Sequence, residues 1–421
     1  MSSDTTPEQE PMAPRLAFLR GATVVAVGMA IMNVAAYGFT ILGSRRLTPE
    51  EFGAITALLG LLLIGNVASL GLQATGARMI ATHTDDSTAS LADALVKAGR
   101  RGALGLTAVL LVATPLFMWL LHIDSVLPVL LLAPTLGCLT LMGSELGVLQ
   151  GSKRWTELAA VYTAVGVGRL VLGGGALLIH PSLDSAMIGL TLGAAVPTLL
   201  GAFLLRGSSG ATSEHIKEVL RGTVHGTHTL LAFFVMANAD VLLARALLDG
   251  TDSGYYAAGV IVAKACLFLP QFVIVVVFPT LASSPGDTVR LRRAIQAVAA
   301  LGFCTVIGTL LLPDLVVAII GGEEKYAPLG PYTWLFAISG SAYAVLQLVV
   351  YAAIAQQEKR AALLIWVGLV VLVLAAGIVL GTGIATGLNG VLVLVAMTST
   401  CALLLSAGLA AGLRRQASDA N

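Results

Sequence analysis

Charged residues are scarce in this sequence: Asp, Glu, Lys and Arg together make up 11% of its 421 residues. An ordinary water-soluble domain carries about a quarter, whereas 57% of this chain is hydrophobic. So few charges cannot cover the water-exposed surface of a chain of this length, which excludes a soluble globular protein. The net charge of +1 also provides no strongly basic surface for nucleic acid.

Cysteine is also rare, and common enzyme motifs are missing. The four cysteines lie singly within apolar runs, without the Cys and His spacing of a zinc site. The sequence has no G-x-x-x-x-G-K-[ST] nucleotide loop, no H-E-x-x-H metal helix and no G-x-S-x-G nucleophile turn. We therefore expect a protein that is not an enzyme and that holds no metal or cofactor.

Long apolar runs dominate the chain. A membrane-spanning helix needs about 20 mainly apolar residues, and the sequence predicts an all-α polytopic membrane protein with about twelve of them. The first run is too long for the apolar part of a cleavable signal peptide. The first six predicted spans are 22–43, 54–80, 103–121, 126–149, 158–179 and 185–205. The second six are 229–248, 255–281, 294–320, 330–355, 361–380 and 388–409.

Lys and Arg alternate between loops as the positive-inside rule requires. With the N-terminus in the cytoplasm, 18 of the 24 basic residues fall in cytoplasmic segments and 4 in external ones. A missed or false span would invert every later loop and remove this contrast. We therefore predict a multi-pass plasma (inner) membrane protein with both termini cytoplasmic. The basic segments 90–101, 213–221 and 287–294 are predicted either to lie along the inner membrane surface or to form solvated elbows.

Six spans in each half give both halves the same orientation, as in a parallel internal repeat. Asn66 with Gln73 has the same spacing as Lys264 with Gln271, at similar places in the two halves. The predicted division is a cytoplasmic tail at 1–21, an N-terminal six-helix bundle at 22–205, a cytoplasmic linker at 206–228, a C-terminal six-helix bundle at 229–412 and a cytoplasmic tail at 413–421.

Three ionisable residues lie well inside predicted spans: Arg169, Asp240 and Lys264. A charge at the bilayer centre costs roughly 2.5–3.5 kcal/mol, so each one calls for a function or a partner. Two bases with one acid leave a positive interior, which suits an anionic group such as phosphate or pyrophosphate. The alternative is a structural ion pair between Asp240 and one of the bases. Charges nearer to span ends are predicted to snorkel to the interface: Arg45, Arg46, Arg78, Glu145 and Arg245.

Polar and small residues inside the spans allow two readings. Asn33, Gln73, Asn238 and Gln271 either line a water-filled cavity or form hydrogen bonds between helices.

Glycines four residues apart predict close helix packing. Such pairs are Gly143 with Gly147, Gly189 with Gly193, Gly377 with Gly381 and Gly408 with Gly412.

Two stretches of the sequence resemble a known family. The turn between the first two spans reads RRLTPEEFGA at 45–54, and the second half begins with NADVLLAR at 238–245 and GYYA at 254–257. Both resemble polysaccharide biosynthesis flippases of the O-antigen type. That family shares a superfamily with multidrug and toxic compound extrusion antiporters and lipid II flippases. The resemblance implies two six-helix bundles around a central cavity.

The resemblance also implies a function. It implies export of an undecaprenyl-pyrophosphate-linked oligosaccharide across the plasma membrane by alternating access, with Asp240 as the candidate for ion coupling. The implied partners are the lipid-linked glycan, membrane lipids and, as candidates, a polysaccharide polymerase or glycosyltransferases, with no nucleic acid. The substrate-binding residues would be Arg169, Lys264, Asn33, Gln73, Asn238 and Gln271.

Three other classes of protein compete with this hypothesis. A cation-coupled drug antiporter of the same superfamily would need acids in its cavity, because its substrates are cationic. A major-facilitator transporter usually carries a G-x-x-x-D-[RK]-x-G-[RK]-[RK] loop, which the segment 82–101 lacks. A membrane scaffold without transport activity would not need charges inside several spans.

Overall fold

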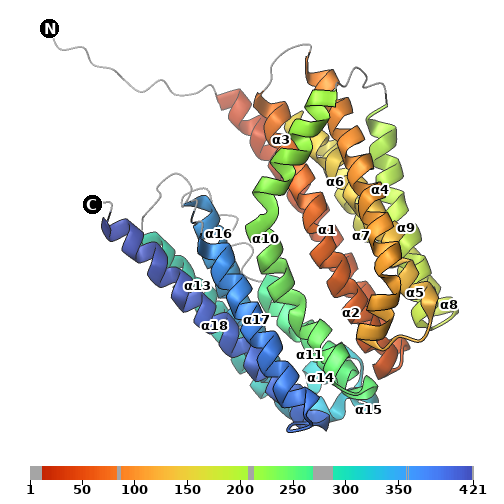
Figure 1. Ribbon diagram of the computed structural model, residues 1–421, viewed down its shortest axis with the longest axis vertical. Helices are drawn as coiled ribbons and strands as arrows, with labels where there is room; N and C mark the ends of the chain where they lie inside the picture. The colour runs from red at the N-terminus through yellow and green to blue at the C-terminus, as the bar shows by residue number, and fades with distance from the viewer. Residues whose placement is uncertain are drawn as a thin grey trace.

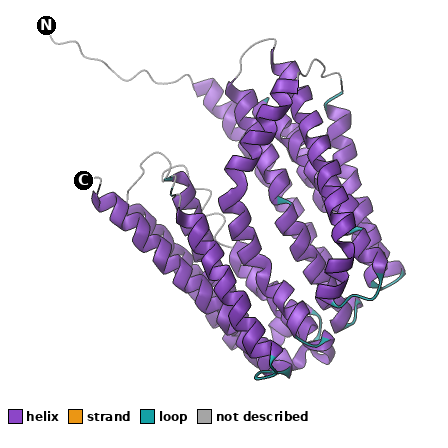
Figure 2. Cartoon of the chain, in the orientation of Figure 1, coloured by secondary structure: helices purple, strands orange, loops and turns teal. Residues whose placement is uncertain are grey.

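The computed structural model describes residues 12–82, 87–206, 213–268, 288–356, 358 and 360–419, and these residues form helices joined by turns, with no strand among them (Figure 2). Helices satisfy their backbone hydrogen bonds internally, as a lipid environment requires. Eleven helical stretches within this part of the chain are long and apolar enough to cross a membrane. The remaining predicted span, 255–281, lies only partly within the described residues, and its described part is helical.

The first half of the chain contains six of these spans, three of which are interrupted. The second span is interrupted at Asn66, between α2 and α3, and the fourth at Leu131, between α5 and α6. The fifth contains a π-helix, η1, between α7 and α8. The elements are α1 (Met12–Arg46), α2 (Pro49–Gly65), α3 (Val67–Thr82), α4 (Ser87–Leu121), α5 (Val126–Leu130), α6 (Leu132–Gly151), α7 (Trp155–Gly168), η1 (Arg169–Gly174), α8 (Gly175–Ile179) and α9 (Leu183–Leu204).

The second half also consists of helices, some of them short. Its elements are α10 (Ser213–Leu247), α11 (Gly250–Phe268), α13 (Thr288–Leu311), α14 (Pro313–Ile320), α15 (Glu323–Tyr326), the 3-10 helix η2 (Ala327–Tyr332), α16 (Thr333–Ala355), α17 (Arg360–Gly381) and α18 (Gly387–Asp419).

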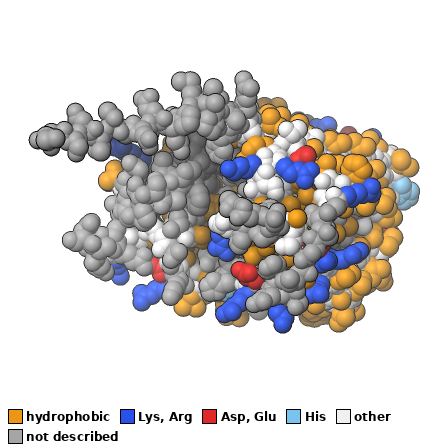
Figure 3. Space-filling view, turned by 90° about the horizontal axis from the view of Figure 1, so that it is seen from above, with side chains coloured by type: hydrophobic (Ala, Val, Ile, Leu, Met, Phe, Trp, Pro, Cys, Tyr) orange, Lys and Arg blue, Asp and Glu red, His pale blue; other side chains and the backbone are white. Residues whose placement is uncertain are grey.

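Two basic segments predicted to be interfacial helices or elbows are neither. Segments 90–101 and 213–221 are continuous with the spans that follow them, so that α4 and α10 have 35 residues each. At 1.5 Å per residue such a helix is about 52 Å long, well beyond the ~30 Å of a bilayer core. Each helix is therefore longer than is needed to cross a bilayer core, and Figure 3 shows basic side chains on the face of the molecule at the end where both chain termini lie.

The helices draw together at one end of the molecule and spread apart toward the end that carries both chain termini (Figure 1). At the narrow end, which we call the closed end, α1 passes into α2 and the short helices α14 and α15 lie beside them. One core cluster joins the halves and includes Phe52 of the first half with Tyr256, Tyr326 and Phe336 of the second.

Helices α10 and α11 connect the halves. Helix α10 packs against α2, α3 and α4 as well as α17, and α11 packs against α2 and α16. The turn before α2 is ordered by a capping box, in which the Thr48 hydroxyl accepts from the Glu51 backbone N–H and the Glu51 carboxylate accepts from the Thr48 N–H. The boundaries predicted for the two bundles and the linker, and the side on which the termini lie, stay predictions.

Candidate functional site

A cavity of about 390 Å³ lies in the first half, and α11 of the second half completes its wall. Its volume is in the range of small-molecule pockets, about 300–1,000 Å³. Leu, Met, Val, Ile and Ala side chains make up much of the lining. The uncharged polar lining residues are Asn33, Tyr37, Thr40, Thr56, Asn66, Ser69, Gln73, Thr135 and Tyr162.

Arg169 lines this cavity at the first residue of η1. Its guanidinium carbon lies 5.1 Å from the centre of the Phe39 ring, a cation–π contact that orients the side chain. Its Nε is buried and has no hydrogen-bond partner among the described residues. π-helical turns within α-helices often occur at functional sites, and this one presents a cation with unused hydrogen-bonding capacity.

Lys264 lines the same cavity from α11. It is the one charged group that the described part of the second half contributes to the lining. No described carboxylate lies within ion-pair distance of Lys264 or Arg169. A direct ion pair, considered as an alternative for these residues, is therefore not formed, although Asp240 lies near enough to Lys264 for the two charges to attract each other.

Gln73 and Asn33, both predicted to bind substrate, also line the cavity. The Gln73 Nε2 donates to the Gln150 Oε1 and to the Tyr162 hydroxyl, each at 2.8 Å, which joins α3, α6 and α7. Gln73 therefore lines the cavity and also forms hydrogen bonds between helices. Asn66 was not among the predicted substrate-binding residues, yet it lines the cavity, and its buried Oδ1 has no partner among the described residues.

Asp240 and Asn238 do not line the cavity. The Asp240 side chain is 7% exposed and accepts from the Val241 N–H at 2.8 Å and from the Tyr256 hydroxyl at 3.2 Å. The Asn238 Nδ2 donates to the Phe234 carbonyl of its own helix. Gln271 lies outside the described residues. The structure therefore brings together four of the seven predicted site residues.

Two charges predicted to snorkel to the interface are buried instead. Glu145 is 1% exposed, and neither carboxylate oxygen has a hydrogen-bond partner among the described residues. Arg245 is 5% exposed. Distance from the end of a span did not predict burial here, because α9 packs against Glu145 and the end of α4 packs against Arg245. Arg45, Arg46 and Arg78 are exposed, as the prediction requires.

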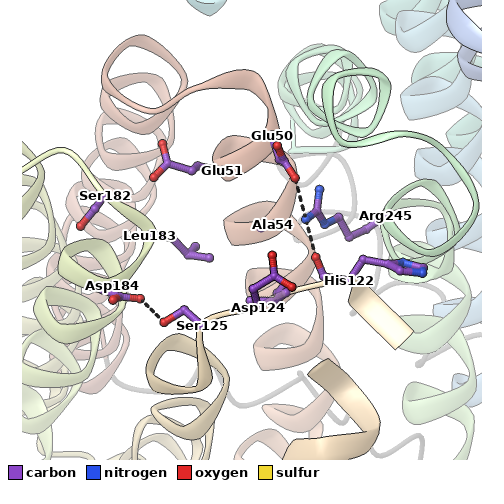
Figure 4. A pocket seen from close by; sticks show the side chains of 11 residues that line it. Glu50, Glu51, Ala54, His122, Asp124, Ser125, Ser182, Leu183, Asp184 and Arg245 are labelled. Carbon is purple, nitrogen blue, oxygen red and sulfur yellow. Dashed lines mark hydrogen bonds and ion pairs between the residues drawn. The ribbon is translucent and has the colours of Figure 1, made fainter. Parts of the chain in front are cut away.

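A second hollow, of about 280 Å³, opens at the closed end between α2, the α4–α5 turn and the start of α9 (Figure 4). Glu50, Glu51, Asp124 and Asp184 line it. Arg245 lies at its edge, where its guanidinium is 3.7 Å from Glu50 and donates to the backbone between α4 and α5.

The many apolar spans, the two halves that spread from a closed end (Figure 1) and the cavity between helices define the class of this protein, which is a multi-pass α-helical membrane protein. Two solved structures share the fold. One is an inward-facing multidrug resistance MATE family transporter, with a TM-score of 0.73 and 14% identity, covering 93% of this chain and 95% of that one. The other is the lipid II flippase MurJ, with a TM-score of 0.72 and 9% identity, covering 94% and 90%.

The sequence comparisons define the family within that class. The family of polysaccharide biosynthesis proteins matches residues 18–284, and this chain belongs to it. Uncharacterised proteins of Mycobacterium bovis and Mycobacterium tuberculosis are 26% identical to it over 375 residues, covering 82% of this chain and 83% of theirs.

Proposed function

We propose that this transporter flips an undecaprenyl-pyrophosphate-linked oligosaccharide across the plasma membrane by alternating access. The observation that carries the proposal is the charge of the cavity: Arg169 and Lys264 line it, and no acidic residue is found among its described lining residues. Neither cation has a described carboxylate within ion-pair distance, and Asp240 is the one described acid that attracts Lys264 from outside the cavity. An anionic ligand between the two cations would supply the negative charge that their burial requires.

The rest of the lining supports an amphiphilic substrate. Apolar walls are suited to an isoprenoid chain, whereas the two cations and the free Asn66 Oδ1 gather in the same space. Pyrophosphate carries two adjacent anionic groups, and Arg is suited to grip one of them with paired hydrogen bonds. Asp240 remains our candidate for ion coupling, although it lies outside the cavity.

A cation-coupled drug antiporter is the alternative within this superfamily. A cavity for cationic drugs needs carboxylates in its walls. The described acids nearest to the spans' interior, Asp240 and Glu145, do not line this cavity. The lining therefore favours the lipid-linked anion.

A binding measurement tests the proposal. Purified protein would be titrated with undecaprenyl pyrophosphate in detergent, beside Arg169→Gln and Lys264→Gln. A charge-assisted hydrogen bond contributes about 1.5–3 kcal/mol, so each variant should raise Kd roughly 10- to 150-fold. Arg46→Gln removes an exposed charge outside the cavity and is the matched control.

Equal affinities for the wild type and both cavity variants would reject the pyrophosphate site. The antiporter would be favoured if a cationic dye bound more tightly than undecaprenyl pyrophosphate, both to the wild type and to Arg169→Gln.

A further inference from the structure

Three cationic side chains at the closed end donate to backbone carbonyls across the boundary between the halves. The Lys325 Nζ of α15 donates to the carbonyls of Arg45 at 2.7 Å and Leu47 at 3.0 Å, where α1 ends. In the opposite direction, the Arg45 guanidinium of α1 donates to the Ala318 carbonyl near the end of α14, at 2.9 Å. At this place each half thus provides a cation that binds the C-terminal end of a helix in the other half.

Arg245 makes the third contact of this kind. It lies on α10 and donates through Nε to the Leu121 carbonyl at 2.8 Å and through a terminal nitrogen to the His122 carbonyl at 2.9 Å, where α4 ends. Figure 4 shows its guanidinium directed toward His122 and Glu50. The same guanidinium donates to the Ser253 hydroxyl of α11 at 3.2 Å, so Arg245 links α10, α11 and α4.

The acceptors have a common physical character. The last four carbonyls of a helix have no partner within that helix, and the partial negative charge at a helix C-terminus attracts cations. Each of these helix ends belongs to one half, and the cation that caps it belongs to the other. The contacts can therefore form only while the halves are together at this end.

We propose that Arg45, Arg245 and Lys325 form a latch that holds this end of the transporter closed by reciprocal capping of helix C-termini. Opening this end to the opposite side of the membrane requires all three caps to break, and the freed carbonyls and cations then become hydrated. The inference rests on alternating access between the halves and not on the identity of the lipid-linked substrate.

Arg46 provides a matched comparison within the same turn. It carries the same charge as Arg45 one residue further along α1, is exposed, and forms no ion pair with the described residues of the second half. If net positive charge at this end mattered, removal of either arginine would have the same effect. If capping matters, only Arg45 would have an effect.

The test uses one cysteine in the cavity as a sensor. Leu63 lines the cavity and is 37% exposed, so Leu63→Cys would be introduced after Cys138, Cys266, Cys304 and Cys401 have been replaced by Ser. A membrane-impermeant thiol reagent is added to sealed vesicles of either orientation, and a tag on the C-terminus reports which side carries the termini. The measured quantity is the modification rate from the side opposite to the termini.

Lys325→Gln and Arg45→Gln should each raise that rate about tenfold, because each removes charge-assisted hydrogen bonds that only the closed state makes. The modification rate in Arg46→Gln should stay within twofold of the rate in the protein with wild-type Arg45, Arg245 and Lys325. Lys325→Arg should raise the rate much less than Lys325→Gln does. Rates for Lys325→Gln and Arg45→Gln that match Arg46→Gln would overturn the proposal.

A disulfide across the latch separates opening from unfolding. A Cβ on Gly250 of α11 would lie 2.9 Å from the Glu50 Cγ of α2, so Glu50→Cys with Gly250→Cys is a suitable pair. Oxidising this pair in the Lys325→Gln variant should restore slow modification, and reduction should reverse the effect. A rate that stays high after oxidation would mean that the variant has unfolded locally, and it would reject the latch.

Discussion

Glu145 leads to the most direct prediction about stability. Its carboxyl lies between α6 and α9, 1% exposed, with both oxygens lacking a hydrogen-bond partner among the described residues. Gly201 of α9 makes the space for it, since a Cβ there would lie 2.2 Å from the Glu145 Oε2. A buried polar group without a partner costs about 1–3 kcal/mol.

Glu145→Met replaces the carboxyl by an apolar, unbranched side chain of similar length. We expect it to stabilise the folded protein by about 1–3 kcal/mol, because it removes two unsatisfied polar atoms without needing new space. Glu145→Gln keeps an unsatisfied polar group of the same shape and should unfold near the wild-type temperature. Thermal unfolding of purified protein in detergent, followed by the loss of monodisperse material, measures both variants.

The opposite outcome would refute this reasoning. If Glu145→Met unfolds several degrees below the wild type while Glu145→Gln does not, the carboxyl has a partner, such as an ordered water, that an amide replaces and a thioether does not. Gly201→Ala is an independent check. It should destabilise the protein through the close approach to the Glu145 carboxyl, and more weakly in the presence of a smaller side chain at position 145.

Two further predictions concern packing around the cavity. Phe39→Leu removes the ring beneath Arg169, a contact worth about 0.5–2 kcal/mol. It should weaken undecaprenyl pyrophosphate binding measurably, whereas Phe39→Tyr keeps the ring and should keep the affinity. Equal affinities for both variants would show that the ring does not position Arg169. Gly193→Ala places a Cβ 2.7 Å from the Gly168 carbonyl oxygen and should lower thermal stability. The Cβ of Gly377→Ala meets no described atom within 4 Å, so this variant should leave thermal stability unchanged or slightly raised. Equal unfolding midpoints for the two variants would refute the packing at Gly193.

The number and order of the spans could be predicted from the sequence because a lipid environment requires long apolar helices. The helix ends on the side of the chain termini could not be predicted, since α4 and α10 continue through basic segments that composition alone assigns to a loop or an interface. Packing partners were equally hidden. Gly189 and Gly193 lie against another backbone, as their spacing predicts. A Cβ added at Gly377 or Gly381 would meet no described atom within 4 Å, although their spacing is the same.

The candidate site shows the same division. Arg169 and Lys264 could be found because charges inside spans are rare, and the structure places them in one cavity. Asp240 has the same sequence signal but faces Tyr256 within the second half. Arg245 was predicted to snorkel, because a sequence does not show that the end of α4 lies beside it. Which half of the molecule a charge faces is set by tertiary packing, and spacing along one helix does not report it.

Flipping by purified protein in liposomes tests the central claim most directly. Fluorescent undecaprenyl-pyrophosphate-linked oligosaccharide would be placed in both leaflets, and the fraction accessible to a membrane-impermeant quencher would be followed over time. We predict rapid exchange between leaflets for the wild type and for Arg46→Gln, and loss of exchange for Arg169→Gln and Lys264→Gln. Exchange that is equally fast in all four proteins, or transport of a cationic dye that neither cavity variant changes, would contradict the account.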